Sequence, residues 1–257
     1  MGETDTGAYA VNLNDLLAHY GRVMPAGAVR DVDRAVRSFG ERHLRHMTKP
    51  PLGPGDPAPD VWLVDKGASI DGSSASDGSV SGGKPTLLST LLASGPVVLK
   101  FYRGRWCPYC TLELRAWQRS LERLDRLGAR FIAVSPQNRT ETESTRLRDG
   151  LTMPLVRDPD NAIARQFGIA YTLLAEERRL MRSMGTDLAA VNGPDGALDG
   201  GAWTLALPAL YLIGQDGRIA YRFVDADYRN RAEPEAVMAA IAALGLSRPV
   251  PAPGSSG

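Results

Sequence analysis

Hydrophobic residues near the start of the chain recur at the spacing of an α-helix. The stretch 11–20 places its aliphatic residues and Tyr20 at helical positions, and Pro25 interrupts the pattern. A second run over 29–44 puts Val, Phe and Leu roughly on one face and Arg, Asp and Glu on the other. The proline- and glycine-rich segment 50–59 can form neither a helix nor a central strand. The pattern therefore predicts a helical extension over residues 1–50 and a separate domain after it.

Beyond residue 60, short hydrophobic runs alternate with runs of helical periodicity. Strands are predicted at 61–64, 96–102, 130–134, 154–156, 209–213 and 218–223, and helices at 86–92, 108–127, 140–149, 161–167, 172–186 and 234–244. This alternation implies parallel strands with crossover helices on both faces of the sheet. The turn 214–217 joins the last two strands into a hairpin, which adds an antiparallel edge. We therefore expect an α/β domain over 51–247, with a central mixed sheet flanked by helices.

Three segments have the composition of irregular structure. Residues 67–84 and 187–202 are rich in glycine and in Asp, Ser or Asn, and we expect surface loops there. The end of the chain, 248–257, is rich in proline, glycine and serine, and we expect a disordered tail.

Charge and composition narrow the choice of partners and compartment. The chain has 257 residues with 30 Lys and Arg against 29 Asp and Glu, so its net charge is +1. A balanced charge gives no reason to expect a nucleic acid or a membrane as a partner. No segment reaches the length of a transmembrane helix. The first residues, MGETDTGAYA, lack the basic and apolar regions of a signal peptide, so we expect a cytoplasmic protein.

The 2 cysteines of the chain, Cys107 and Cys110, follow the predicted strand 96–102 as a C-x-x-C pair. Pro108 suits the first position of a helix, so both sulfurs are expected near a helix N-terminus, where backbone N–H groups and the helix dipole stabilise a thiolate. Arg103 and Arg105 are close enough in sequence to reach the sulfurs. The spacing therefore favours a redox-active pair.

Three other interpretations of the pair are weaker. Two inert buried cysteines would not need a position between a strand and a helix. A zinc site needs four ligands, and only His43 and His46 are spaced to complete a set. A Cys-His protease lacks a recognisable partner residue. We therefore expect no metal and no cofactor.

A proline opens the predicted strand at 209–213. Pro208 follows Leu207 there, and a buried strand does not normally begin with proline without a reason. A cis Leu207–Pro208 bond that faces the C-x-x-C turn would be such a reason. In that arrangement Pro208, with Trp106 and Tyr109, would line a substrate groove.

Several motifs resemble the peroxiredoxin (AhpC/TSA) family of the thioredoxin-fold superfamily. They are Gly55–Asp60 at the domain entry, Phe101–Tyr102 before the cysteines, Cys110–Glu113 after them, the stretch Asp158–Gly168 and the hairpin around Gly217. The resemblance covers residues 55–245 and is strongest to a subgroup with a C-P-Y-C site and an N-terminal helical extension. It implies a thioredoxin-like fold and thiol peroxidase activity.

The resemblance also assigns roles within the pair. Cys110 occupies the position of the peroxidatic cysteine, while Cys107 and Arg103 stand where the family has threonine and proline. The arginine that the family carries later in the chain would fall near Leu207 and is missing, whereas Pro208 is a thioredoxin-type feature. Cys107 to Cys110, as Cys-Pro-Tyr-Cys, is also the tetrapeptide of glutaredoxins.

Two enzymatic mechanisms and one simpler role follow from this mixture. In a peroxidase, Cys110 attacks a hydroperoxide, Cys107 resolves the sulfenic acid, Arg103 or Arg105 polarises the peroxide, and a thioredoxin- or glutaredoxin-type reductant restores the pair. In a thiol–disulfide oxidoreductase, Cys107 is the more exposed nucleophile and Cys110 resolves the mixed disulfide. The third role is a non-enzymatic, redox-responsive binding module. A homodimer is an open alternative for the assembly.

Overall fold

The computed structural model describes residues 12–23, 49–63, 85–193 and 203–245. The predicted helical run over 29–44, the loop over 67–84 and the tail over 248–257 lie outside the described residues. The helices are α1 (Leu13–Val23), α3 (Leu88–Leu92), α4 (Pro108–Arg126), α5 (Arg139–Asp149), α6 (Ala162–Gln166), α7 (Ala175–Ser183), α8 (Leu188–Asn192) and α9 (Pro234–Ala243). The strands are β1 (Trp62–Leu63), β2 (Thr86–Leu87), β3 (Val97–Phe101), β4 (Arg130–Ser135), β5 (Leu155–Arg157), β6 (Ala170–Thr172), β7 (Thr204–Ala206), β8 (Ala209–Ile213) and β9 (Ile219–Val224).

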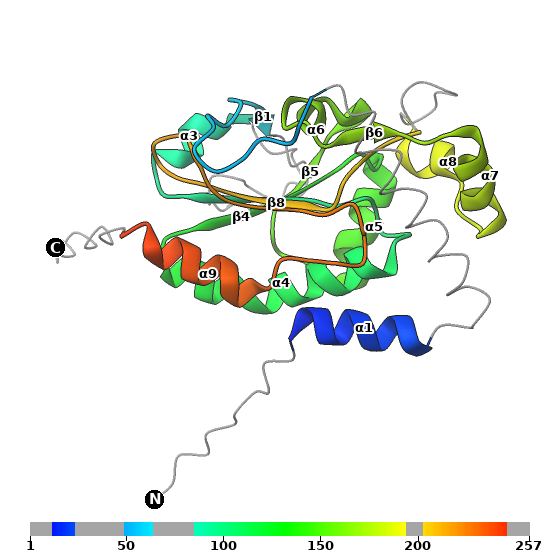
Figure 1. Ribbon diagram of the computed structural model, residues 1–257, viewed down its shortest axis with the longest axis horizontal. Coiled ribbons are helices and arrows are strands. Elements are labelled where there is room, and N and C mark those ends of the chain that lie inside the picture. The colour runs from blue at the N-terminus through cyan, green and yellow to red at the C-terminus, as the bar shows by residue number, and fades with distance from the viewer. Residues whose placement is uncertain (1–11, 24–48, 64–84, 194–202, 246–257) are drawn as a thin grey trace, which may run out of the picture.

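A mixed sheet of five strands in the order β5-β4-β3-β8-β9 forms the centre of the molecule (Figure 1). β3 pairs in parallel with β4, and β4 with β5, while β8 is antiparallel to both β3 and β9. The predicted mixed sheet and its late hairpin are therefore confirmed. Two short antiparallel pairs, β1 with β2 and β6 with β7, lie outside this sheet.

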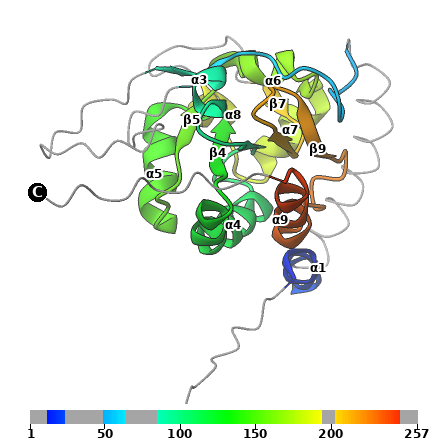
Figure 2. The same cartoon turned by 90° about the vertical axis from the view of Figure 1, so that its left-hand side faces the viewer.

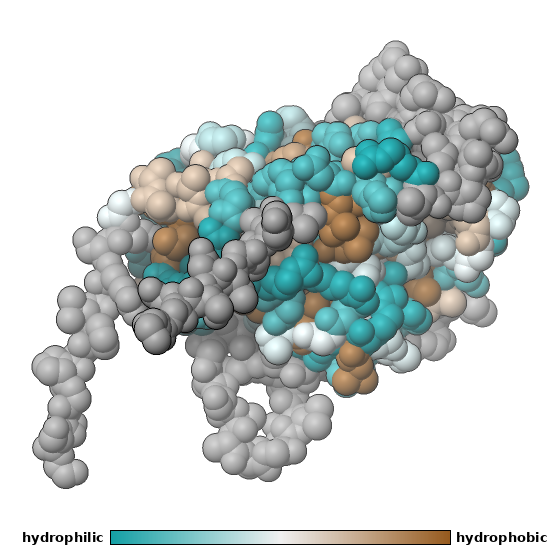
Figure 3. Space-filling model, turned by 90° about the horizontal axis from the view of Figure 1, so that it is seen from below, coloured by the Kyte–Doolittle hydropathy of each residue, from teal (hydrophilic) through white to brown (hydrophobic). Residues whose placement is uncertain are grey.

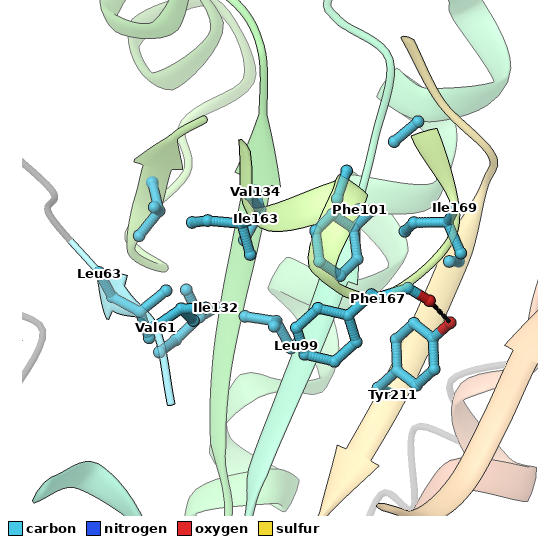
Figure 4. Close-up of a cluster of buried hydrophobic side chains, with 14 of the residues drawn as sticks. Val61, Leu63, Leu99, Phe101, Ile132, Val134, Ile163, Phe167, Ile169 and Tyr211 are labelled. Atoms are coloured by element: carbon cyan, nitrogen blue, oxygen red, sulfur yellow. Dashed lines mark hydrogen bonds between the residues drawn. The ribbon is translucent and has the colours of Figure 1, made fainter. Parts of the chain in front are cut away.

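The two faces of the sheet bury different sets of side chains because successive residues of a strand point to opposite sides. On β3, Leu99 and Phe101 join the cluster on the side of α3 and α6. Figure 4 shows Phe101 packed with Phe167 and Tyr211, whose ring centroids lie 5.3 and 6.2 Å from that of Phe101. The intervening Lys100 must therefore point to the opposite face.

That opposite face is covered by α4 and α9, and α1 lies against this helical layer (Figure 2). Leu13 and Leu17 of α1 are buried in the same cluster as Trp117 and Leu114 of α4. Seen from this side, the described surface is mostly hydrophilic with separate hydrophobic patches (Figure 3). This distribution fits helices that turn their apolar sides inward. Within the described ranges, none of the helices combines the length and hydrophobicity that a bilayer span requires.

Three stretches differ from the sequence prediction. The helix expected over 172–186 is preceded by strand β6, and the loop expected over 187–202 begins with the short helix α8. β6 pairs with β7, with Thr172 opposite Thr204. Such a pairing depends on contacts between segments that are distant in sequence, so local periodicity does not reveal it. The segment 86–92 likewise begins as strand β2 before α3.

Substitution of two glycines with the same backbone angle tests whether segment 49–52 packs tightly against the end of α6. Gly128 and Gly168 both have φ of +71°, but a Cβ on Gly168 would lie 2.4 Å from the carbonyl oxygen of Pro50, whereas one on Gly128 meets nothing within 4 Å. In both alanine variants the free energy of unfolding should fall by about 1–2 kcal/mol, because alanine disfavours the left-handed backbone conformation. Gly168→Ala should lose about 1–3 kcal/mol more, because backbone atoms must move to remove the overlap.

Urea unfolding of the two variants measures this difference directly. An equal loss of stability in Gly168→Ala and Gly128→Ala would show that segment 49–52 is not held against the end of α6.

Candidate active site

Both cysteines lie where the central strand β3 gives way to helix α4. Cys107 is the N-cap residue of α4, Pro108 is its first residue and Cys110 lies in the first turn. The connecting loop is tight, since Gly104 has φ of +146° and a Cβ there would come within 2.5 Å of the indole nitrogen of Trp106. The location at the C-terminal tip of the central strand agrees with the sequence prediction.

The exposure of the two thiols differs from the expectation. Cys107 and Cys110 are both free thiols with 1% of their surface exposed, so Cys107 is not the more exposed sulfur. Burial of this kind follows from the layer of helices and aromatic rings over the turn, which the local sequence does not reveal. Access to either sulfur is therefore limited to small molecules unless the cover opens.

Arg103 provides the first buried cation of the site. Its guanidinium donates a hydrogen bond from Nη2 to Cys107 Sγ at 3.1 Å. The guanidinium carbon lies 4.0 Å from the ring centroid of Tyr228 and 4.9 Å from that of Trp106. These cation–π contacts hold the charge beside the sulfur in a buried position.

Arg231 provides the second buried cation, on the side of Cys110. Its Nη2 lies 3.7 Å from Cys110 Sγ, and its Nε donates to Glu113 Oε2 at 2.6 Å. The other carboxylate oxygen of Glu113 pairs with Lys100 Nζ at 2.7 Å. The carboxylate thus binds one cation from β3 and one from the segment between β9 and α9.

These charges make the two thiols unequal. Burial by itself would raise the pKa of Cys107, but the hydrogen bond from the Cys110 thiol and the charge of Arg103 outweigh burial and hold that pKa well below its usual value. Burial and the proton donated to Cys107 hold the pKa of Cys110 well above its usual value, although Arg231 acts in the opposite direction. The pair therefore shares one proton, with the thiolate on Cys107 and the thiol on Cys110.

Burial also disfavours the charged forms of Lys100 and Glu113, which pair beneath the thiols. Desolvation lowers the pKa of Lys100, while the neighbouring carboxylate raises it. Desolvation likewise raises the pKa of Glu113, and the charges of Lys100 and Arg231 lower it. Direct contact between the opposite charges offsets part of the cost of burying them.

The structure brings some of the sequence-predicted residues together and separates others. Arg103, Trp106 and Tyr109 surround the pair, and Tyr109 packs edge-on against Tyr20 and Tyr228 at centroid distances of 5.4 and 5.9 Å. Tyr109 is buried rather than open to a substrate.

Arg105 does not contact the sulfurs. Its side chain forms an ion pair with Glu141 of α5, and its backbone N–H donates to the side chain of Gln137. The backbone turn at Gly104 sends Arg103 inward and Arg105 outward, so sequence proximity misleads here.

Pro208 lies at the same end of the sheet as the cysteine turn. Ala209 is paired with Phe101, the last residue of β3, so the preceding Pro208 is level with Tyr102, where the chain leaves the sheet. Pro208 is buried. The cis geometry of the Leu207–Pro208 bond and its contact with the sulfurs stay predictions.

Sequence reasoning missed Arg231 and Tyr228, and it left Lys100 and Glu113 without a role in the site. A lone lysine within the apolar strand 96–102 needs a buried partner, and Glu113 lies one helical turn after Cys110 on the same face, so these two could have been found. Arg231 is 121 residues from Cys110, and no local pattern singles it out.

No group of three or more His, Cys, Asp or Glu side chains within the described ranges is arranged to hold a metal ion. His43 and His46, which were considered as zinc ligands, lie outside these ranges.

The five-stranded mixed sheet, with a C-x-x-C pair at the tip of its central strand, defines the protein as a member of the thioredoxin-fold class. The model of the AhpC/TSA family matches residues 54–222, and the chain belongs to this family. The family suggested by the sequence motifs is thereby confirmed.

Similar proteins of known sequence and structure agree with this assignment. Two Mycobacterium tuberculosis proteins named as peroxiredoxins, from strains CDC 1551 and H37Rv, are each 32% identical over 95 residues, which is 37% of this chain. The chain matches 61% of the length of these curated relatives. Peroxidoxin BcpB of M. tuberculosis has a TM-score of 0.53 at 20% identity, covering 75% of this chain and 98% of BcpB. AhpC of M. tuberculosis has a TM-score of 0.54 at 15% identity, covering 76% of this chain and 94% of AhpC. These solved structures share the fold.

Substitution of Arg103 and of Arg105 in a Cys110→Ser background tests which arginine lowers the pKa of Cys107. Arg103→Met should raise the pKa of Cys107, because it removes the cation that lies 3.1 Å from the sulfur. Arg105→Met should leave this pKa unchanged, because Arg105 is paired with Glu141. The rate of alkylation by iodoacetamide, measured against pH, gives the midpoint for each variant. Equal midpoints in the two variants would contradict the assignment of Arg103.

Proposed function

We propose that the protein is a thiol-dependent peroxidase that reduces hydrogen peroxide or organic hydroperoxides through Cys107 and Cys110. The observation that carries the proposal is a buried dithiol with a buried arginine at each sulfur, 3.1 Å from Cys107 and 3.7 Å from Cys110. The lowered pKa of Cys107 and the raised pKa of Cys110 agree with it. Both sulfurs are 1% exposed, and a small hydroperoxide suits such a site better than a folded protein does as the oxidising substrate. Membership of the AhpC/TSA family supports the same chemistry.

The unequal thiols suggest the order of the steps. The thiolate of Cys107 attacks the terminal oxygen of the hydroperoxide, so that an S–O bond forms and the O–O bond breaks. The Cys110 thiol gives its proton to the departing alkoxide or hydroxide, which leaves as an alcohol or water. The guanidinium groups of Arg103 and Arg231 stabilise the negative charge that develops on the departing oxygen.

The second step closes the disulfide. The thiolate of Cys110 attacks the sulfur of the Cys107 sulfenic acid and releases hydroxide, so the two thiols have supplied two electrons to the peroxide. This order assigns the first attack to Cys107, whereas the family pattern places the peroxidatic position at Cys110. The pKa of Cys107, held low by its hydrogen bonds, is the reason for the reassignment.

Regeneration needs two electrons from a thiol reductant. We propose a protein of the thioredoxin or glutaredoxin type, which attacks one sulfur of the disulfide and then resolves the mixed disulfide. Because both sulfurs are buried in the dithiol form, part of the cover over the turn must open in the disulfide form. A cytoplasmic location, where dithiols are kept reduced, is part of this proposal, and a homodimer stays a prediction. The division into an extension over 1–50 and a domain over 51–247 is likewise proposed.

Thiol–disulfide exchange is the second candidate function. The low pKa of Cys107, as the first cysteine of Cys-Pro-Tyr-Cys, favours it, because a thiolate at this position attacks disulfides as well as peroxides. Burial of the sulfur argues against a folded protein as the substrate.

Single serine variants test the function and the order of the steps together. Cys107→Ser should not react with hydrogen peroxide, because the thiolate is lost. Cys110→Ser should consume one equivalent of peroxide and stop at a sulfenic acid, because the resolving thiol is lost. Mass spectrometry after trapping with dimedone identifies the product at each cysteine.

Each other result has a definite meaning. Sulfenic acid in Cys107→Ser, with an unreactive Cys110→Ser, would return the first attack to Cys110 and keep the peroxidase. Reduction of insulin disulfides by wild-type protein, without any reaction with peroxide, would overturn the peroxidase in favour of exchange. Inertness toward both would leave a non-enzymatic module.

A further inference from the structure

Asn14 of helix α1 binds the backbone of the arginine beside Cys110. Its Oδ1 accepts a hydrogen bond from the N–H of Arg231 at 3.1 Å, and its Nδ2 donates to the carbonyl oxygen of Arg231 at 2.9 Å. One side chain thus satisfies both backbone polar groups of a single residue. Arg231 is 217 positions further along the chain, so the contact joins the N-terminal helix to the thiol site.

Glu233, two residues after Arg231, binds the first residues of α1. The carboxylate of Glu233 accepts hydrogen bonds from the backbone N–H groups of Leu13 at 2.9 Å and Asn14 at 2.7 Å. A carboxylate at a helix N-terminus satisfies free N–H groups and interacts favourably with the helix dipole. Asn14 Nδ2 also donates to Glu233, so both the backbone and the side chain of Asn14 bind this carboxylate.

The rest of α1 packs over the turn that carries the cysteines. Leu13 and Leu17 are buried in the same cluster as Cys107 and Cys110. Tyr20 contacts the ring of Tyr109, which lies between the two cysteines in sequence. The helix is therefore seated on the site by both polar and apolar contacts.

Arg231 stands in a segment that has no regular structure of its own. Residues 225–233, between β9 and α9, are neither helix nor strand. The guanidinium of Arg231 must nevertheless meet Glu113 and lie near Cys110. Its Nη1 also donates to the backbone carbonyl oxygens of Tyr228 and Asn230. The direction of this long side chain therefore depends on where the backbone of this irregular segment lies.

We propose that Asn14 is a positioning residue of the thiol site, which holds the backbone of Arg231 so that its guanidinium stays between Glu113 and Cys110. Helix α1 is then a working part of the site rather than an appendage to the domain. The inference deepens the proposed function, since it concerns the same dithiol, but it does not depend on the identity of the oxidising substrate.

The consequence for Cys110 follows from the charges that face it. Burial raises its pKa and the Cys107 thiolate raises it further, while Arg231 and Arg103 lower it. The Lys100–Glu113 ion pair lies beneath these groups. If the Arg231 guanidinium moves away from the sulfur, a stabilising cation is lost and the pKa of Cys110 rises.

The test uses the full chain in a Cys107→Ser background, so that Cys110 titrates without a second thiol. Asn14→Ala should move the midpoint of Cys110 alkylation by iodoacetamide to higher pH. Below the midpoint it should slow the reaction by about tenfold, which is the loss of thiolate that one pKa unit produces. His19→Ala is the matched control, because His19 is exposed on the same helix. It should leave the midpoint unchanged.

A double-variant cycle separates positioning from a general loosening of the fold. Arg231→Lys keeps a cation for Glu113 but gives up the reach and the two-sided contacts of the guanidinium. If Asn14 acts through Arg231, then adding Asn14→Ala to Arg231→Lys should cause no further shift of the midpoint. Thermal unfolding of each variant shows whether stability changes in parallel.

Two outcomes would overturn the inference. An unchanged midpoint in Asn14→Ala would show that Arg231 keeps its place without Asn14. An equal shift in the Arg231→Lys background would show that Asn14 acts by another route. Because alkylation needs no peroxide, a wild-type protein that fails to reduce peroxides would refute the proposed function and leave this test intact.

Discussion

The carboxylate of Glu113 lies fully buried beneath the two cysteines and binds cations from two distant parts of the chain. Lys100 reaches it from the central strand and Arg231 from the segment before α9, at 2.7 and 2.6 Å. Loss of one partner from a buried ion pair costs about 3–5 kcal/mol, because an uncompensated charge is left without water. The three groups therefore have to stay together. Their contact joins the second turn of α4 to the central strand and places Arg231 near Cys110.

The positions of the sulfurs on this frame explain why two neighbouring cysteines behave differently. Cys107, at the N-cap of α4, receives the Arg103 guanidinium at 3.1 Å, whereas Cys110 lies 3.7 Å from Arg231. Burial raises the pKa of both thiols, but the closer arginine and the hydrogen bond from Cys110 lower that of Cys107. Arg231 lies farther from Cys110 and is paired with Glu113, so the proton favours Cys110. In the peroxidase that we propose, this pair supplies a nucleophile with a proton donor beside it.

Helix α1 is connected to the thiol site through the helical layer on one face of the sheet. One face of the sheet packs against α3 and α6, and the other packs against α4 and α9. Helix α1 lies outside α4 and α9 (Figure 2). An outer helix held only by apolar contacts could shift without affecting the thiols. The hydrogen bonds of Asn14 to Arg231 instead make the seating of α1 and the charge near Cys110 depend on each other.

The sequence by itself determined the features that depend on neighbours along the chain. The apolar run 96–102, the proline after Cys107 and the turn 214–217 predict the central strand, the start of α4 and the late hairpin, and the family motifs agree with them. The pairing of β6 with β7, the burial of both thiols and the choice of Arg231 over Arg105 as the second cation were decided only by the tertiary structure. Arg105 is five residues from Cys110 but is turned toward Glu141, while Arg231 arrives from 121 residues away. Local sequence sets the backbone preference of each segment, but the charge that reaches a buried sulfur depends on which distant segments fold over it.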